Sequence, residues 1–310
     1  MTQLLQHFAN GLSVGTVYAL IALGYTMVFG VLKLINFAHG DVYMVGAFAG
    51  YYLGNVLGVN RNPSVAGAAL VTIGAMGICG ALGYVIERFA YRPLRHRPRL
   101  TALITAIGVS FLLEYGFQLQ PWFSSPIEFP PGPSPRFFPS LIEYQAWTFL
   151  DGVTVSNFDL LGFGTAVGLM FCLQWIVYRT RFGTAMRAAS FDPQVAGLMG
   201  IPVDRIISGT FVLGSMLAAA AGVINGVSRY KIDPLFGLMP GLKAFVAAVL
   251  GGIGSVPGAM VGGLVIGLAE EYVAGYTVSS YRDAIAFTIL ILVLLFRPAG
   301  LFGSFRPEKV

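Results

Sequence analysis

Long apolar runs alternate with short polar segments along this 310-residue chain. A helix of about 20 apolar residues crosses a bilayer. On this measure the pattern predicts nine spans, at Phe8–Gly30, Gly40–Leu57, Ser64–Ile86, Leu100–Gln120, Phe158–Tyr178, Ile206–Val227, Leu238–Ile253, Gly258–Tyr276 and Ala284–Phe296. The seventh run is short and contains Lys243, which is typical of a broken or re-entrant helix. We therefore expect an all-α polytopic membrane protein with about 8–10 transmembrane helices, some of them broken or re-entrant.

Composition supports this class, because 56% of the residues are hydrophobic and only 11% are charged. A soluble domain carries about 25% charged residues, so lipid must replace water around much of this chain. No soluble domain interrupts the pattern, and we expect residues 1–310 to form a single transmembrane domain. Met1–Asn10 lacks the basic start of a cleaved signal peptide, so the first span is expected to be retained.

Basic residues indicate the orientation. Five arginines lie in Glu87–Arg99, four in the segment 179–205, and three basic residues follow the last span. Because cytoplasmic segments carry an excess of Lys and Arg, we expect the N-terminus outside and the C-terminus in the cytoplasm. The segment 121–157 contains seven prolines and is expected to form an irregular external loop, with a short element near Ser140–Leu150. It either connects two spans or offers a surface to an extracytoplasmic partner.

The segment 179–205 contains signals for a short capped helix. Asp192 is a good N-cap, and Pro193 suits the first helical position, where its missing N–H costs nothing. Gly200 tolerates the left-handed conformation that often ends a helix, and Pro202 prevents continuation. We predict one to two helical turns outside the bilayer that contact another protein.

A second polar group occurs at the predicted start of the second span. Asn36, His39 and Asp41 surround Gly40, which permits a bend, and Glu114 lies inside the fourth apolar run. Ionisable groups within a membrane are costly and suggest function, so these residues are candidates for the translocation path or its gate. The alternative is that Asn36 or Asp41 merely caps the second helix, and that Glu114 has a structural role. Glu270, Glu271 and Asp283 flank the last external turn and are expected at solvated helix ends.

Several chemistries have no signature in the sequence. There is no phosphate-binding Gly-x-x-x-x-Gly-Lys-[Ser/Thr] loop and no His-Glu-x-x-His metal motif. We therefore expect no cofactor, no metal and no enzymatic activity in this chain. The excess of basic residues reflects the position of the loops and does not indicate nucleic-acid binding.

Several stretches together resemble the permeases of branched-chain amino acid ABC importers, specifically the LivH-type subunit. They are Tyr18–Gly30, Ile35–Asp41, Asp192–Asp204, Ala247–Gly258 and Phe296–Gly303. The resemblance implies a multi-pass subunit of a bacterial inner membrane, surrounded by lipid, which moves branched-chain or other hydrophobic amino acids inward. Its implied partners are a homologous second permease, two ATPase subunits that hydrolyse ATP, and a periplasmic binding protein. The family's ATPase-coupling motif maps onto Asp192, Ala196, Gly200 and Ile201, together with Pro193, although its usual Glu-Ala-Ala opening is absent.

Two alternatives remain open at this point. Urea and short-chain amide permeases look similar to this sequence. A self-contained secondary transporter or channel would need ion-coupling carboxylates deep in the bundle, and only Glu114 offers itself.

Overall fold

Each of the nine predicted spans coincides with a helix. The computed structural model describes residues 2–34, 36–95, 97–122, 128–149 and 152–303. The corresponding helices are α1 (Thr2–Leu32), α2 (His39–Val56), α3 (Val65–Ile86), α4 (Arg99–Gln118), α5 (Asn157–Arg179), α8 (Val203–Arg229), α9 (Leu238–Gly251), α10 (Val256–Tyr276) and α11 (Tyr281–Phe296). Six helices in the described ranges are long and apolar enough to cross a membrane, namely α1, α3, α4, α5, α8 and α10. The predicted all-α membrane class is confirmed, and the seventh run forms a helix of only 14 residues.

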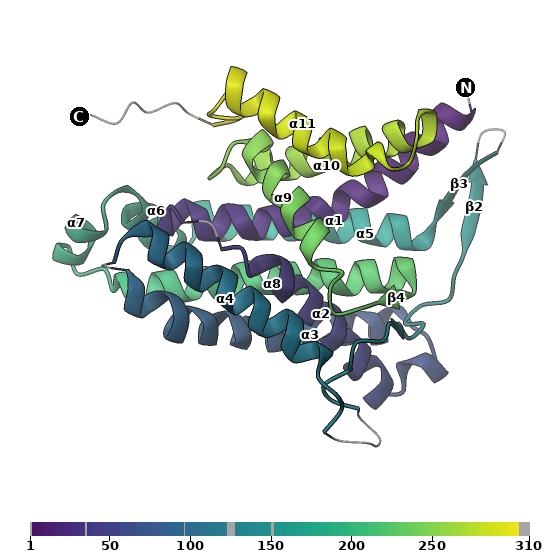
Figure 1. Cartoon of the computed structure of the whole chain (residues 1–310), viewed down its shortest axis with the longest axis horizontal. Helices are drawn as coiled ribbons and strands as arrows, with labels where there is room; N and C mark the ends of the chain where they lie inside the picture. The colour runs from purple at the N-terminus through teal and green to yellow at the C-terminus, as the bar shows by residue number, and fades with distance from the viewer. Residues whose placement is uncertain (1, 35, 96, 123–127, 150–151, 304–310) are drawn as a thin grey trace.

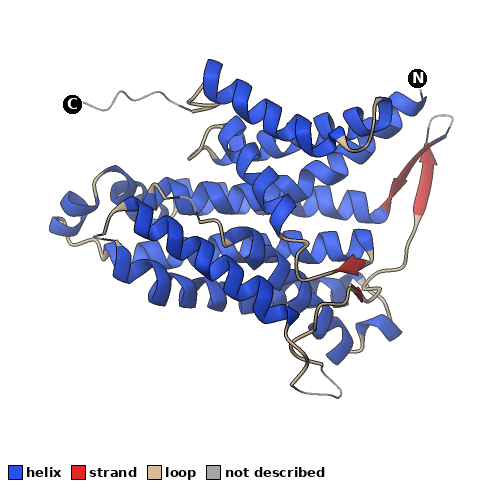
Figure 2. Cartoon of the chain, in the orientation of Figure 1, coloured by secondary structure: helices blue, strands red, loops and turns tan. Residues whose placement is uncertain are grey.

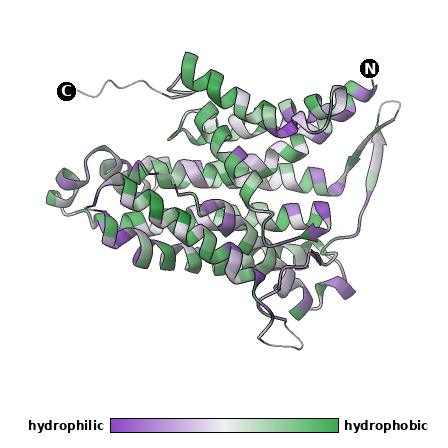
Figure 3. Ribbon diagram, viewed as in Figure 1, coloured by the Kyte–Doolittle hydropathy of each residue, from purple (hydrophilic) through white to green (hydrophobic). Residues whose placement is uncertain are grey.

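Helices α1 and α8 form the buried centre of the bundle and run antiparallel. A Cβ added at Gly214 of α8 would lie 3.2 Å from the carbonyl oxygen of Gly24 in α1, so the two backbones approach closely. In the most apolar stretches of α1 and α8, 83% and 78% of the residues are buried, whereas only 22% are buried in those of α3, α4 and α5. Figure 3 shows apolar positions along most of the long helices. Exposed apolar surface of this extent indicates contact with lipid or with another membrane subunit.

Short helices lie at one end of the bundle, which we call the α7 end. They are η2 (Glu87–Tyr91), η3 (Arg92–Leu94), α6 (Arg181–Phe191) and α7 (Pro193–Leu198). Helix α6 was not predicted as a separate element. It begins where the Thr180 hydroxyl accepts a hydrogen bond from the Gly183 N–H at 3.1 Å, which is an N-cap signal readable from the sequence.

The opposite end of the bundle carries the strands, and we call it the hairpin end (Figure 2). Strands β2 (Ala146–Phe149) and β3 (Val153–Ser156) form an antiparallel hairpin. Strand β1 (Arg136–Phe137) pairs with β4 (Lys231–Ile232), and the short helix η1 (Val59–Arg61) lies between α2 and α3. The expectation that 121–157 is irregular was therefore wrong in part. The expected element near Ser140–Leu150 corresponds to β2, with residues 123–127 and 150–151 outside the described ranges.

Candidate functional site

Helix α7 is capped as the sequence predicts. The Asp192 carboxylate accepts hydrogen bonds from the N–H groups of Gln194 and Val195 at 2.8 and 3.0 Å, and Pro193 occupies the first turn. At the other end Gly200 has φ +82°. The Ile201 N–H donates to the Ala196 carbonyl at 3.1 Å, and the Gly200 N–H donates to the Gly197 carbonyl at 3.0 Å. This pair of bonds is a Schellman motif, so all five residues predicted here fix the ends of one short helix.

Helix α7 presents apolar side chains to its surroundings although it lies beyond the ends of the long helices. Val195, Leu198 and Met199 are 53%, 87% and 79% exposed, while Ala196 is buried. Beside α7 is a hollow of about 970 Å³, which is lined by polar and charged residues including Arg88, Gln194 and Arg205. The exposed apolar side chains of α7, next to a cavity lined by several arginines, form a surface that is suited to binding another protein.

A cluster of charges ties the α7 end to the bundle. The Arg95 guanidinium pairs with Glu87 and Asp204, and Arg92 also pairs with Asp204. The Ser208 hydroxyl donates to the buried Glu87 carboxylate. Asp204 lies in the first turn of α8, directly after the α7 segment, so these ion pairs join the start of α8 to η2 and η3. The pairing of these residues was not predicted from the sequence, in which the arginines indicate only the orientation.

The polar group near the start of α2 is buried and does not cap the helix. The N-cap position is Ala38, and no side chain caps it. The Tyr91 hydroxyl donates to the Asn36 side chain at 2.8 Å, and the Ser110 hydroxyl donates to the Asp41 carboxylate. The capping alternative for Asn36 and Asp41 is therefore wrong, because both side chains bind partners from other helices.

His39 and Glu114 complete this buried group. The His39 ring packs edge-on against Tyr25, with ring centroids 4.7 Å apart. A Cβ added at Gly24 would lie 2.3 Å from His39 Nε2, so this glycine makes room for the ring. Glu114 is buried on α4, and its carboxyl group interacts electrostatically with that of Asp41. The structure therefore brings together residues from α1, α2 and α4 that are far apart in the sequence.

The starts of α2 and α9 meet inside the bundle. A Cβ added at Gly40 would lie 2.8 Å from the Gly237 carbonyl oxygen and 3.1 Å from Gly241 Cα. His39 packs against Gly24, which lies eight residues before the end of α1, a depth of roughly 12 Å at 1.5 Å per residue. Both short helices thus begin below the ends of the long ones. A cavity of about 130 Å³ between α2, α4 and α9 is lined by Gly40, Asp41, Ser110 and Gly241.

Lys243 and Glu270 form a second buried ion cluster. Lys243 Nζ lies 2.9 Å from a Glu270 carboxylate oxygen and 2.6 Å from one of Asp283, and the Tyr18 hydroxyl donates to Glu270 at 2.9 Å. Glu270 is almost fully buried, so the expectation that it lies at a solvated helix end was wrong. The reason is that Lys243 on α9 compensates its charge inside the bundle.

The described ranges contain no group of three or more His, Cys, Asp or Glu side chains that could hold a metal ion. Glu87, Glu270 and Asp41 pair with an arginine, a lysine and a hydroxyl group, respectively.

Comparison with known proteins identifies the family. A family model described as "Branched-chain amino acid transport system / permease component" matches residues 7–294. The chain is 43% identical to the high-affinity branched-chain amino acid transport system permease protein BraD of Pseudomonas aeruginosa, over 99% of this chain and 98% of that protein. It is 42% identical to the corresponding protein LivH of Escherichia coli, over 99% of this chain and 97% of LivH. The chain therefore belongs to the family of permease components of branched-chain amino acid transport systems.

Proposed function

We propose that this chain is the membrane-spanning subunit through which an ABC importer moves branched-chain amino acids into a bacterial cell. The similarity to BraD and LivH over almost the whole chain supports the substrate class. The complex would also contain a second, homologous permease, two ATPase subunits and a periplasmic binding protein. This chain would lie in the inner membrane and would hydrolyse no ATP itself.

The exposed apolar surface of α7 is the main support for its proposed role in coupling the permease to an ATPase subunit. Its caps hold Leu198 and Met199 rigidly in position, and the Glu87–Arg95–Asp204 cluster joins it to α8. An ATPase subunit that grips α7 would therefore move the starts of the long helices. Asp192, Pro193, Ala196, Gly200 and Ile201 hold the helix in shape for this contact.

The buried group at the start of α2 is the proposed gate of the translocation path. Helices α2 and α9 begin inside the bundle, and their starts are in contact through the backbones of Gly40 and Gly237. We propose that small movements of the two helices open this joint. Asn36, His39, Gly40, Asp41 and Glu114 surround this joint. Their hydrogen bonds to Tyr91 and Ser110 link it to the α7 end and to α4.

The decisive experiment is uptake by the complete complex in proteoliposomes. We expect ATP-dependent accumulation of leucine, isoleucine and valine that requires the binding protein. Accumulation of urea without leucine would replace the proposed substrate class by urea or amides. Leucine uptake by the permease alone, driven by an ion gradient, would instead make it a secondary transporter.

The proposed orientation places the α7 end in the cytoplasm and the hairpin end outside. It is tested by cysteine labelling in a Cys172→Ser background, since Cys79 is buried and Cys172 is exposed. An impermeant thiol reagent added to whole cells should label Ser134→Cys and should not label Leu198→Cys. Arg95 is unsuitable for this test because it is mostly buried in its ion pairs. Labelling of Leu198→Cys alone would reverse the orientation.

A further inference from the structure

A cavity of about 580 Å³ lies at the hairpin end of the bundle. Its walls are the first half of α1, the last turns of α8, the start of α5 and the segment that leads into α9. Tyr43, Phe236 and Met239 lie at its inner end, next to the joint formed by Gly40 and Gly237. Arg229 and Lys231 are exposed, so the cavity reaches the protein surface. Its volume is in the range of pockets that hold small ligands.

The cavity has an excess of positive charge. Its lining includes Arg229, Lys231, Lys243 and Arg282, and the lining carboxylate is Asp233. Lys243 is compensated by Glu270 and Asp283, and Arg282 pairs with Glu271 at 3.0 Å. Within the described ranges Arg229 and Lys231 form no ion pair, and Arg229 Nε donates only to the Asn225 side chain, at 3.1 Å. Arg229 and Lys231 are thus available to bind an anionic group of a ligand.

A buried hydroxyl group points to the same ligand. Tyr43 is fully buried and lines the cavity. Its hydroxyl oxygen makes no hydrogen bond within the usual distance and angle limits to any described residue, and its polar neighbours are the Asn225 side chain, which is within weak hydrogen-bonding reach, and Arg229. A buried hydroxyl that is only weakly hydrogen-bonded costs free energy, and a ligand oxygen in the cavity would give it a full partner.

We propose that this cavity is a binding site for the free amino acid, in which Arg229 and the Tyr43 hydroxyl hold the α-carboxylate. The proposal rests on the function proposed above and adds a site at the entrance of the path. The carboxylate accepts hydrogen bonds from the Arg229 guanidinium and from Tyr43. Asp233, the one carboxylate among the described residues that line the cavity, faces the ammonium group. The site lies on the outer side of the Gly40–Gly237 joint, so it holds the substrate before the gate.

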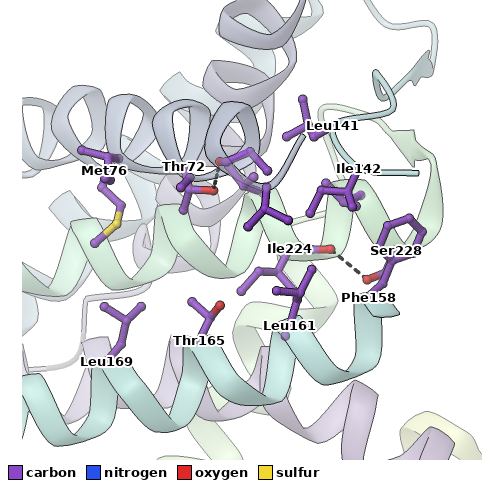
Figure 4. A pocket seen from close by; sticks show the side chains of 17 residues that line it. Thr72, Met76, Leu141, Ile142, Phe158, Leu161, Thr165, Leu169, Ile224 and Ser228 are labelled. Atoms are coloured by element: carbon purple, nitrogen blue, oxygen red, sulfur yellow. Dashed lines mark hydrogen bonds between the residues drawn. The ribbon is translucent and has the colours of Figure 1, made fainter. Parts of the chain in front are cut away.

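A second, apolar cavity adjoins the first one. It has a volume of about 350 Å³ and lies between α3, α5 and α8 (Figure 4). Phe158, Gly162, Ile224 and Ser228 line both cavities. The Ser228 hydroxyl is turned to the Ile224 carbonyl at 2.9 Å, so this shared wall is apolar. A branched side chain placed against Ile224 and Phe158 would lie away from water, while the charged end faces Arg229.

The test is equilibrium binding of radiolabelled leucine to the detergent-solubilised complex without the binding protein. We expect saturable binding that 4-methylpentanoate, which keeps the carboxylate, displaces. Leucinamide, which lacks the carboxylate, should displace it about tenfold less well. Arg229→Gln should weaken binding about tenfold and Tyr43→Phe about fivefold, the effects of losing a charged and a neutral hydrogen bond.

Matched controls separate these effects from general damage. Arg61→Gln removes a positive charge at the hairpin end outside the cavity, and Tyr115→Phe removes an exposed hydroxyl of α4, so both should bind leucine as the wild type does. Absence of saturable binding, equal displacement by leucinamide, or wild-type affinity in both Arg229→Gln and Tyr43→Phe would overturn the proposal. Uptake by the wild-type complex is measured separately. Failure of leucine uptake there counts against the proposed function, while the binding assay still decides the site.

Discussion

Helix α7 and the start of α2 are both short polar interruptions of an apolar chain, but they are built in opposite ways. The contacts that shape α7 join residues within ten positions of one another, such as Asp192 with Val195 and Ile201 with Ala196. The contacts at the start of α2 join residues 55 and 69 positions apart, in the pairs Asn36–Tyr91 and Asp41–Ser110. The first region is a rigid local unit on the surface, and the second is a buried joint between helices.

This difference predicts how the two regions respond to substitution. A change in α7 should alter one contact with a partner and leave the bundle intact. A change at the start of α2 should disturb several helices at once, because Asn36 and Asp41 are hydrogen-bonded to η2 and α4, respectively.

The largest effect is expected for Gly24→Val. The added side chain would overlap with His39 and with the Gly214 carbonyl oxygen, 2.3 and 2.9 Å from the new Cβ. Overpacking of this kind costs about 1–3 kcal/mol or more, so we expect loss of most folded protein in size-exclusion chromatography. Gly77→Val is the control, since a Cβ there meets no atom within 4 Å. Wild-type recovery and thermal stability of Gly24→Val would show that His39 is not held by this contact.

Asp41→Ala tests the joint without adding bulk. It removes the acceptor of the Ser110 hydroxyl and leaves that buried hydroxyl without its partner, which costs about 1–3 kcal/mol. We expect leucine uptake to fall about thirtyfold while assembly and basal ATPase activity persist. His39→Ala should also slow uptake, and Glu143→Ala in the loop at the hairpin end should have no effect. Normal uptake in both His39→Ala and Asp41→Ala would make these residues packing elements only.

The two regions also differ in how much of them the sequence could reveal. The caps of α7 follow from residue types at fixed short spacings, so Asp192, Pro193, Gly200 and the helix between them were predicted correctly. The identity of the polar residues near α2 was also visible, but their partners were not. Tyr91 and Ser110 reach them only because α3, α4 and α2 pack together. Glu270 shows the same limit, because its burial depends on Lys243 from another helix.

Leu198→Ser tests the exposed face of α7. Leu198 is 87% exposed, so its replacement should not change the stability of the permease itself. If an ATPase subunit buries this side chain, about 1.5–3 kcal/mol of binding free energy is lost. We expect about tenfold weaker binding of the ATPase in a titration with purified subunits. Leu57→Ser, an exposed leucine at the hairpin end, is the control. Unchanged ATPase affinity would remove Leu198 from the contact.

The smallest effect is expected for Asp192→Ala, which leaves every side chain of α7 in place and removes only its N-cap. The loss of the two hydrogen bonds to Gln194 and Val195 should destabilise the helix by about 1 kcal/mol. Because the ATPase would then have to order α7 on binding, its affinity should fall about fivefold. Asp192→Asn is the matched control, since Asn caps helices as well as Asp does. If Asp192→Asn is as defective as Asp192→Ala, the carboxylate contacts the ATPase directly. If neither variant loses affinity, the caps of α7 do not contribute to ATPase binding. Helix α7 would then tolerate substitution as well as an ordinary surface loop does.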